Sequence, residues 1–182
     1  KENYKAKNIV IATGSDVTTV PGIKIDEKNI ISSTGALSLN KVPNKLLVIG
    51  GGYIGLEMGS VWSRLGSEVT VIEYLDYITP GMDREISKEF QKILNKQGIK
   101  FKLNSKVNSV KTKNDSVLVE FTDNKTSKNE TISADKVLVS VGRKPYTEGL
   151  NLSKIGVLKD EKGRIKVNGK LQTSISNIYA IG

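Results

Sequence analysis

The chain has 182 residues, 37% of them hydrophobic, which is enough for one compact domain or for one domain with parts of another. It contains neither cysteine nor histidine, which excludes a disulfide framework, thiol chemistry and most zinc, copper or iron sites. The formal net charge is +9, but scattered lysines supply most of it, which indicates a solvated surface and not a nucleic-acid partner. No apolar run approaches the roughly 20 residues needed to cross a bilayer, so no membrane partner is expected.

The first predicted element is an apolar, β-branched run at residues 8–12. It is expected to be a buried strand that leads into a tight turn at residues 13–15. Residues 16–44 are expected to form a connector with one short strand at residues 30–31 and one helical turn at residues 34–39.

The clearest pattern in the chain is a strand, a glycine-rich turn, a helix and a second strand. Residues 46–49 are wholly apolar, residues 69–72 are apolar except for Thr70, and between the two runs apolar side chains recur at helical spacing. This order predicts a βαβ unit with parallel strands, in which Met58 and Trp62 belong to the core.

A second helix is predicted at residues 83–97, where Asp83 can cap the free amides at its start. Its buried face is expected to contain four apolar residues, namely Ile86, Phe90, Ile93 and Leu94. A third strand is expected at residues 99–103.

The pattern then changes to two-residue alternation, which predicts an antiparallel hairpin or meander at residues 107–133. A buried parallel strand is expected at residues 137–141, and short strands at residues 164–167 and 178–181. The predicted fold is therefore α/β, with a Rossmann-like parallel sheet, helices and an antiparallel β-meander.

Three glycines carry the strongest chemical signal, because Gly50, Gly52 and Gly55 form G-x-G-x-x-G between the predicted strand and helix. The first glycine permits a tight turn, the second lets the backbone approach a diphosphate, and the third lets helix and strand pack closely. The amides at the start of the helix then offer a partial positive charge to the phosphates.

Glu73 stands 23 positions after Gly50, at the end of the second strand. A carboxylate there accepts hydrogen bonds from the adenosine ribose hydroxyls. It also repels the 2′-phosphate of NADP, and no arginine follows at residues 74–77, so the sequence predicts NAD. The alternative interpretation is that Glu73 is a surface acid at the end of a strand.

Two further residues of this segment have open interpretations. Tyr53 could cover a nicotinamide pocket or serve in packing, and Glu57 could point toward the nicotinamide or be a solvated acid on the helix surface.

Several segments together resemble the flavin-dependent pyridine nucleotide-disulfide oxidoreductase family, and within it the dihydrolipoamide dehydrogenases. The resemblance is carried by residues 11–15, 48–62, 64–66, 69–73, 82–86, 141–145 and 178–182.

In that family the NAD domain interrupts the flavin domain. The resemblance therefore implies an NAD-binding domain at residues 41–145, flanked by flavin-domain segments at residues 1–40 and 146–182. It places Thr13, Gly14 and Ser15 near FAD. It also implies an NAD site lined by Gly50, Gly51, Gly52, Tyr53, Ile54, Gly55, Glu57, Glu73, Val107 and Gly142.

The resemblance implies a parent enzyme that would transfer electrons from dihydrolipoamide through a disulfide and FAD to NAD. The family's redox-active cysteine pair and its His-Glu pair have no counterpart in this chain, so no catalytic residue is expected here and the chain alone is expected to be inactive. Because the chain lacks an initial Met and stops within a strand-like run, we expect a longer parent protein. The resemblance implies a homodimer that serves a 2-oxoacid dehydrogenase complex, in the bacterial cytoplasm or the mitochondrial matrix.

Two alternatives stay open from the sequence, namely a different FAD- and NAD-dependent disulfide oxidoreductase and a stand-alone NAD-binding module. A short-chain dehydrogenase would need a Tyr-x-x-x-Lys pair, and none of the six tyrosines has lysine four positions later.

Overall fold

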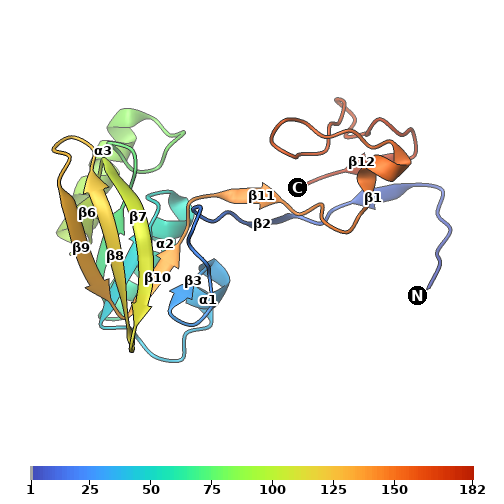
Figure 1. Cartoon of the computed structure of the whole chain (residues 1–182). Helices are drawn as coiled ribbons and strands as arrows, with labels where there is room; N and C mark the ends of the chain where they lie inside the picture. Colours follow the sequence, from blue (N-terminus) through green and yellow to red (C-terminus); the bar gives the residue numbers. More distant parts are fainter. Residues whose placement is uncertain (1) are drawn as a thin grey trace. The chain divides into compact units, whose positions relative to one another are not determined.

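The computed structural model describes residues 2–182, which form two compact units (Figure 1). The first unit contains the residues up to Thr18 together with Arg143–Gly182, and the second is Thr19–Gly142. No helix in the described part of the chain is long and apolar enough to cross a membrane.

A five-stranded parallel sheet forms the centre of the second unit, with strand order β3-β10-β4-β5-β6. These strands are β3 (Ile30–Ile31), β4 (Lys45–Ile49), β5 (Glu68–Ile72), β6 (Lys100–Lys102) and β10 (Lys136–Val139). The helices are α1 (Ser33–Leu37), α2 (Tyr53–Arg64) and α3 (Arg84–Lys96). Helix α2 joins β4 to β5 and α3 joins β5 to β6, which confirms the predicted parallel βαβ unit.

The apolar run of β4 is buried on both faces of this sheet, because successive side chains of a strand point to opposite sides. Leu46 and Val48 belong to a core cluster with helical residues that include Trp62. Leu47 and Ile49 belong to a second cluster, shared with an antiparallel sheet. Met58 packs against the first cluster, so the predicted core positions of α2 are confirmed.

The antiparallel sheet covers the face of the parallel sheet opposite to the helices (Figure 1). It consists of β7 (Ser105–Lys113), β8 (Ser116–Asp123) and β9 (Asn129–Ala134), and Val119 and Phe121 of β8 lie in the shared core. The predicted meander is therefore confirmed, and the second unit has three layers.

Helix α3 differs from its prediction in the face that it buries. Asp83 caps it as expected, since its side chain accepts hydrogen bonds from the amides of Glu85 and Ile86. Of the four apolar residues assigned to the buried face, only Leu94 is buried, while Phe90 is exposed and Ile86 and Ile93 are 56% and 52% exposed. Ser87 takes the buried place instead, seven residues before Leu94. The buried stripe thus lies one residue, or about 100°, around the helix from the stripe of Ile86 and Ile93.

The segment of residues 19–40, which the family resemblance assigns to the end of the first flavin-domain segment and which the residue pattern predicts as a connector, packs inside the second unit. Ile23 and Ile30 lie in the core cluster shared with the antiparallel sheet, and Ile31 lies in the helical cluster.

The first unit contains two strand pairs and one 3-10 helix. In it β1 (Ile9–Ile11) pairs in parallel with β12 (Ile178–Ala180), β2 (Ser15–Val17) pairs antiparallel with β11 (Arg143–Pro145), and η1 (Leu152–Ile155) contributes to a small core. The strand predicted at residues 8–12 is confirmed as β1, but its predicted burial is wrong in this chain, because β1 has one partner strand and Ile9 and Val10 are exposed. At residues 164–167 the structure has a single β-bridge, Lys159 to Ile165, in place of the predicted strand.

Candidate dinucleotide-binding site

The glycine-rich turn lies at the carboxyl end of β4, beside the carboxyl end of β5, where open parallel sheets bind ligands. Gly50 has a φ of +108°, a conformation that side chains rarely adopt, and its amide donates to the Ile72 carbonyl at 2.9 Å. A Cβ at Gly50 would also lie 2.5 Å from the Ser140 carbonyl oxygen. The first motif position therefore admits only glycine.

The other two motif glycines have opposite surroundings. A Cβ at Gly55 would lie 2.3 Å from the Gly50 carbonyl oxygen and 2.5 Å from the Ser140 hydroxyl oxygen, so α2 packs directly against the turn. A Cβ at Gly52 would have no atom within 4 Å. This open position faces away from the protein, as the close approach of a ligand to the second glycine requires.

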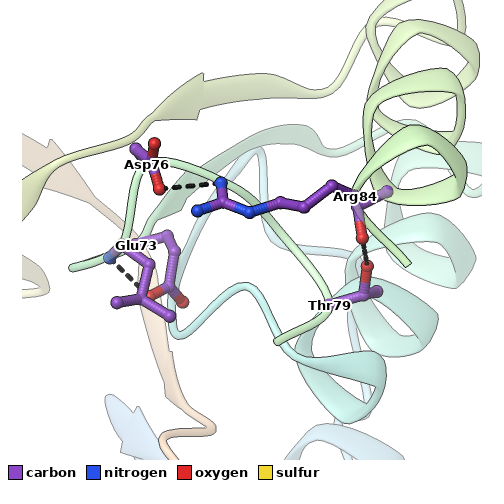
Figure 2. Close-up of polar contacts among 6 residues, drawn as sticks. Glu73, Asp76, Thr79 and Arg84 are labelled. Atoms are coloured by element: carbon purple, nitrogen blue, oxygen red, sulfur yellow. Dashed lines mark hydrogen bonds and ion pairs between the residues drawn. The ribbon is translucent and has the colours of Figure 1, made fainter. Parts of the chain in front are cut away.

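Glu73 lies directly against this turn and is only 8% exposed (Figure 2). Its Oε2 atom accepts a hydrogen bond from the Gly51 amide at 2.6 Å, and its Oε1 atom accepts one from the Leu75 amide at 2.8 Å. The interpretation of Glu73 as a surface acid is therefore wrong. Each carboxylate oxygen retains acceptor capacity beyond these two bonds.

The Gly51 amide is thus occupied within the protein, and the donors that remain at the turn come from the next residues. Gly52 is the N-cap of α2 and provides no side-chain hydrogen bond to the helix. The first amides of α2 have no partner within the helix and carry its partial positive charge. An anion at this turn would meet the amides of Gly52, Tyr53 and Ile54.

The two residues with open interpretations are both exposed. Tyr53, the first residue of α2, is 66% exposed, and Glu57 lies one turn later on the same exposed side. Tyr53 therefore does not pack into the core of the second unit. Its position and that of Glu57 leave both side chains accessible to a ligand at the turn.

The last two residues assigned to the NAD site lie on other elements. Val107 is half-buried, packs against the core under the antiparallel sheet, and lies beside a β-bulge of β7. Gly142 follows β10 with a φ of +131° and has no atom within 4 Å of a built Cβ. Their contact with a dinucleotide stays a prediction.

Ser140 is a residue of this site that the sequence reasoning missed. It follows β10, next to β4 in the sheet, and its hydroxyl donates to the carbonyls of Ile49 at 3.1 Å and Gly50 at 3.3 Å. It thereby holds the start of the turn against the neighbouring strand. The one signal in the sequence is a polar residue that interrupts the apolar run of residues 137–141.

The loop between β5 and α3, together with Arg84 at the start of α3, contains a second group of residues that the sequence reasoning missed (Figure 2). The Arg84 guanidinium lies 3.0 Å from the Asp76 carboxylate and 3.7 Å from the centre of the Tyr77 ring. Thr79 is buried in the same loop, and its amide donates to the Gly51 carbonyl at 2.8 Å. The loop therefore contacts the glycine-rich turn directly.

Thr13, Gly14 and Ser15 lie in the first unit, where they line a cleft of about 710 Å³. The Thr13 hydroxyl donates to the Tyr146 carbonyl at 2.5 Å, and the Arg143 Nε atom donates to the Ser15 hydroxyl at 2.6 Å. Four cationic side chains also line the cleft, namely Arg143, Lys144, Arg164 and Lys166. Asp160 lines the cleft as well and pairs with Arg164 at 2.7 Å, so the lining keeps a net positive charge, which is complementary to a phosphate-containing group.

Residues 2–182 contain no cluster of three or more His, Cys, Asp or Glu side chains suited to a metal ion.

The match to known proteins extends along the whole chain. Residues 1–182 match the family described as pyridine nucleotide-disulphide oxidoreductase, and the chain belongs to this family. It is 58% identical over 178 residues to a mitochondrial dihydrolipoyl dehydrogenase of Pisum sativum and 60% identical over 177 residues to a dihydrolipoamide dehydrogenase of Chaetomium thermophilum. These matches cover 98% and 97% of this chain but only 36% and 35% of the relatives. The chain thus spans about a third of their length.

Two solved structures have the same fold. The HOCl-induced flavoprotein disulfide reductase RclA of Escherichia coli is 32% identical with a TM-score of 0.86, covering 96% of this chain and 39% of that one. LpdA of Mycobacterium tuberculosis is 26% identical with a TM-score of 0.87, covering 98% of this chain and 38% of that one.

Proposed function

We propose that this chain is the NAD-binding part of a flavoprotein dihydrolipoamide dehydrogenase. The observation that carries the proposal is the Glu73 carboxylate, buried at the end of β5 and bonded to the Gly51 amide at 2.6 Å. The Glu73 carboxylate, which can accept from sugar hydroxyls, thus lies directly beside the glycine-rich turn, whose amides can donate to a diphosphate. Two relatives, 58% and 60% identical, are named as a dihydrolipoyl and a dihydrolipoamide dehydrogenase, and these names support the particular activity.

In this proposal each part of the site binds a different part of the dinucleotide. The amides of Gly52 and of the first turn of α2 donate to the diphosphate, and Glu73 accepts from the ribose hydroxyls. The buried carboxylate repels a 2′-phosphate, and Arg84, at the start of α3, is paired with Asp76. The site therefore prefers NAD to NADP.

The first unit would contribute to the flavin site of the same protein. Thr13, Gly14, Ser15 and the cationic side chains of the cleft would hold FAD. When bound, FAD and NAD together supply the electron-transfer chemistry that carries electrons from dihydrolipoamide to NAD. The residues of this chain bind and orient the cofactors, and the redox-active cysteines would come from the rest of the parent protein. The parent would act as a homodimer on dihydrolipoamide carried by a 2-oxoacid dehydrogenase complex.

Calorimetric titration with NADH and NADPH tests the proposal. NADH is expected to bind more tightly, and Glu73→Ala is expected to weaken NADH binding at least about tenfold, since it removes a charged acceptor. The matched control is Glu68→Ala, at the opposite end of β5, where the exposed carboxylate pairs with Lys100. Tighter binding of NADPH, or equal NADH affinities for the two variants, would contradict the proposal.

A further inference from the structure

Thr79 has a backbone conformation that its side chain disfavours. Its φ is +50°, in the left-handed region where a β-branched residue is an outlier, and it is buried. Such a conformation persists only where the surrounding structure holds it, and it is found most often at functional sites.

Two hydrogen bonds hold Thr79 between the glycine-rich turn and α3. Its amide donates to the Gly51 carbonyl at 2.8 Å. Its hydroxyl oxygen lies 2.8 Å from that of Ser87, and this pair is buried. Ser87 lies in α3, whose start is held by the Asp83 cap. A continuous path of contacts therefore leads from the turn through Thr79 to α3.

The first of these bonds orients a ligand donor. The Gly51 carbonyl and the Gly52 amide belong to one planar trans peptide unit, so they point in opposite directions. With the carbonyl directed at Thr79, the Gly52 amide is directed away from that residue. Among residues 2–182 no carbonyl or side chain accepts from the Gly52 amide, and a Cβ at Gly52 would meet open space.

The peptide unit between Gly50 and Gly51 is held as well, because its amide, that of Gly51, donates to Glu73. Glu73 and Thr79 therefore hold two consecutive peptide units of the turn, one through its amide and one through its carbonyl. The Ser87 contact adds a side-chain bond to the backbone bonds that hold Thr79, whose carbonyl also accepts from the Met82 amide at 3.1 Å.

We propose that Thr79 is a positioning residue for dinucleotide binding, which directs the Gly52 amide at the diphosphate and is itself held in place by the Ser87 hydroxyl. This proposal rests on the proposed function. It makes the affinity for a nucleoside diphosphate depend on a hydroxyl pair that does not touch the ligand.

The test is calorimetric titration of the 182-residue chain with NADH, combined with urea unfolding of each variant. Thr79→Val keeps the shape and the backbone amide but removes the hydroxyl, and is expected to weaken NADH binding about fivefold, as is Ser87→Ala. Thr79→Ser keeps the hydroxyl and is expected to bind NADH within about twofold of the unchanged chain.

The double variant Thr79→Val with Ser87→Ala separates positioning from stability. It leaves no buried hydroxyl without a partner, so its stability is expected to recover toward that of the unchanged chain. Its NADH affinity is expected to stay about as low as that of Thr79→Val. Recovery of affinity together with stability would show a purely structural role and would overturn the proposal.

The outcomes also separate this proposal from the proposed function. If the unchanged chain binds no NADH, the proposed function fails and this proposal fails with it. If Glu73→Ala loses affinity while Thr79→Val and the double variant bind NADH as the unchanged chain does, only the role of Thr79 is refuted.

Discussion

Gly52 and Gly55 belong to the same motif but are constrained by different neighbours. At Gly55 a side chain would collide with the backbone of the turn and with Ser140, whereas at Gly52 it would extend into open space. Gly55 thus serves the packing of α2, and Gly52 serves the approach of a ligand.

Alanine substitutions should separate these two roles. Gly55→Ala is expected to lower the free energy of unfolding by about 1–3 kcal/mol, because overpacking forces the turn and helix apart. Gly52→Ala is expected to cost less than about 1 kcal/mol of stability but to weaken NADH binding, because its methyl group would occupy the side open to the ligand. Urea unfolding and calorimetric titration of both variants measure the two effects. Equal losses of stability in the two variants would contradict this division of roles.

Asp26 contributes a pH dependence at the residue scale. Burial raises the pKa of its carboxyl group, but hydrogen bonds from the amides of Lys28, Ile30 and Asn29 outweigh burial and lower the pKa overall. A lowered pKa means that the stabilisation is present above the unfolded-state pKa of about 3.9 and is lost as the pH falls through the folded-state pKa.

Asp26→Asn is therefore expected to be less stable than the unchanged chain at pH 7. The difference should shrink as the pH falls below about 4, because the carboxylate of the unchanged chain becomes protonated there. Urea unfolding of both proteins between about pH 2.5 and pH 7 measures this difference in stability. A difference that is constant over this range would show that the charge of Asp26 contributes nothing.

At the scale of the element, α3 shows that helical spacing of apolar residues does not by itself identify the buried face. Two stripes with seven-residue spacing run side by side on this helix, Ile86 with Ile93 and Ser87 with Leu94. The structure buries the second stripe, where the Ser87 hydroxyl contacts Thr79. The polar contact between Ser87 and Thr79 thus accompanies an orientation of α3 about its own axis that hydrophobicity alone would not predict.

Leu94→Ala and Ile93→Ala form a matched pair for this orientation. Leu94→Ala is expected to cost about 2–5 kcal/mol in the free energy of unfolding, because a buried side chain leaves a cavity. Ile93→Ala is expected to cost less than about 1 kcal/mol, since its side chain is already half exposed. Urea unfolding measures both, and the reverse order of the two losses would contradict the orientation of α3.

At the scale of the whole molecule, every residue assigned to the NAD site belongs to one compact unit. Gly50, Glu73, Thr79, Val107 and Gly142 all lie within Thr19–Gly142, and both large core clusters belong to the same unit. The residues assigned to FAD lie in the other unit.

A protein consisting of residues 19–142 is therefore expected to fold and to bind NADH with an affinity within about threefold of the 182-residue chain, because no binding group is removed. Circular dichroism checks its folding, and calorimetric titration checks its affinity. A folded 19–142 protein without NADH binding would show that the first unit contributes to the site.

The sequence by itself determined the features that depend on local backbone and on short spacing. The positive φ of Gly50, the Asp83 cap and the two-sided burial of residues 46–49 each follow from the residue and its neighbours, so they could be predicted. The position of Glu73 beside the turn follows from the parallel pairing that a βαβ unit imposes.

Only the tertiary structure decided which hydrogen bonds join segments far apart in the chain. The donation of the Gly51 amide to Glu73, the contacts of Ser140 with the turn and the pairing of Thr79 with Ser87 all depend on how elements pack. The same holds for the rotation of α3 and for the exposure of β1, whose burial depends on strands that pair with it. Apolar periodicity shows that a segment can bury one of its faces. Which face is buried depends on the elements that pack against the segment, and its own residues do not specify those elements.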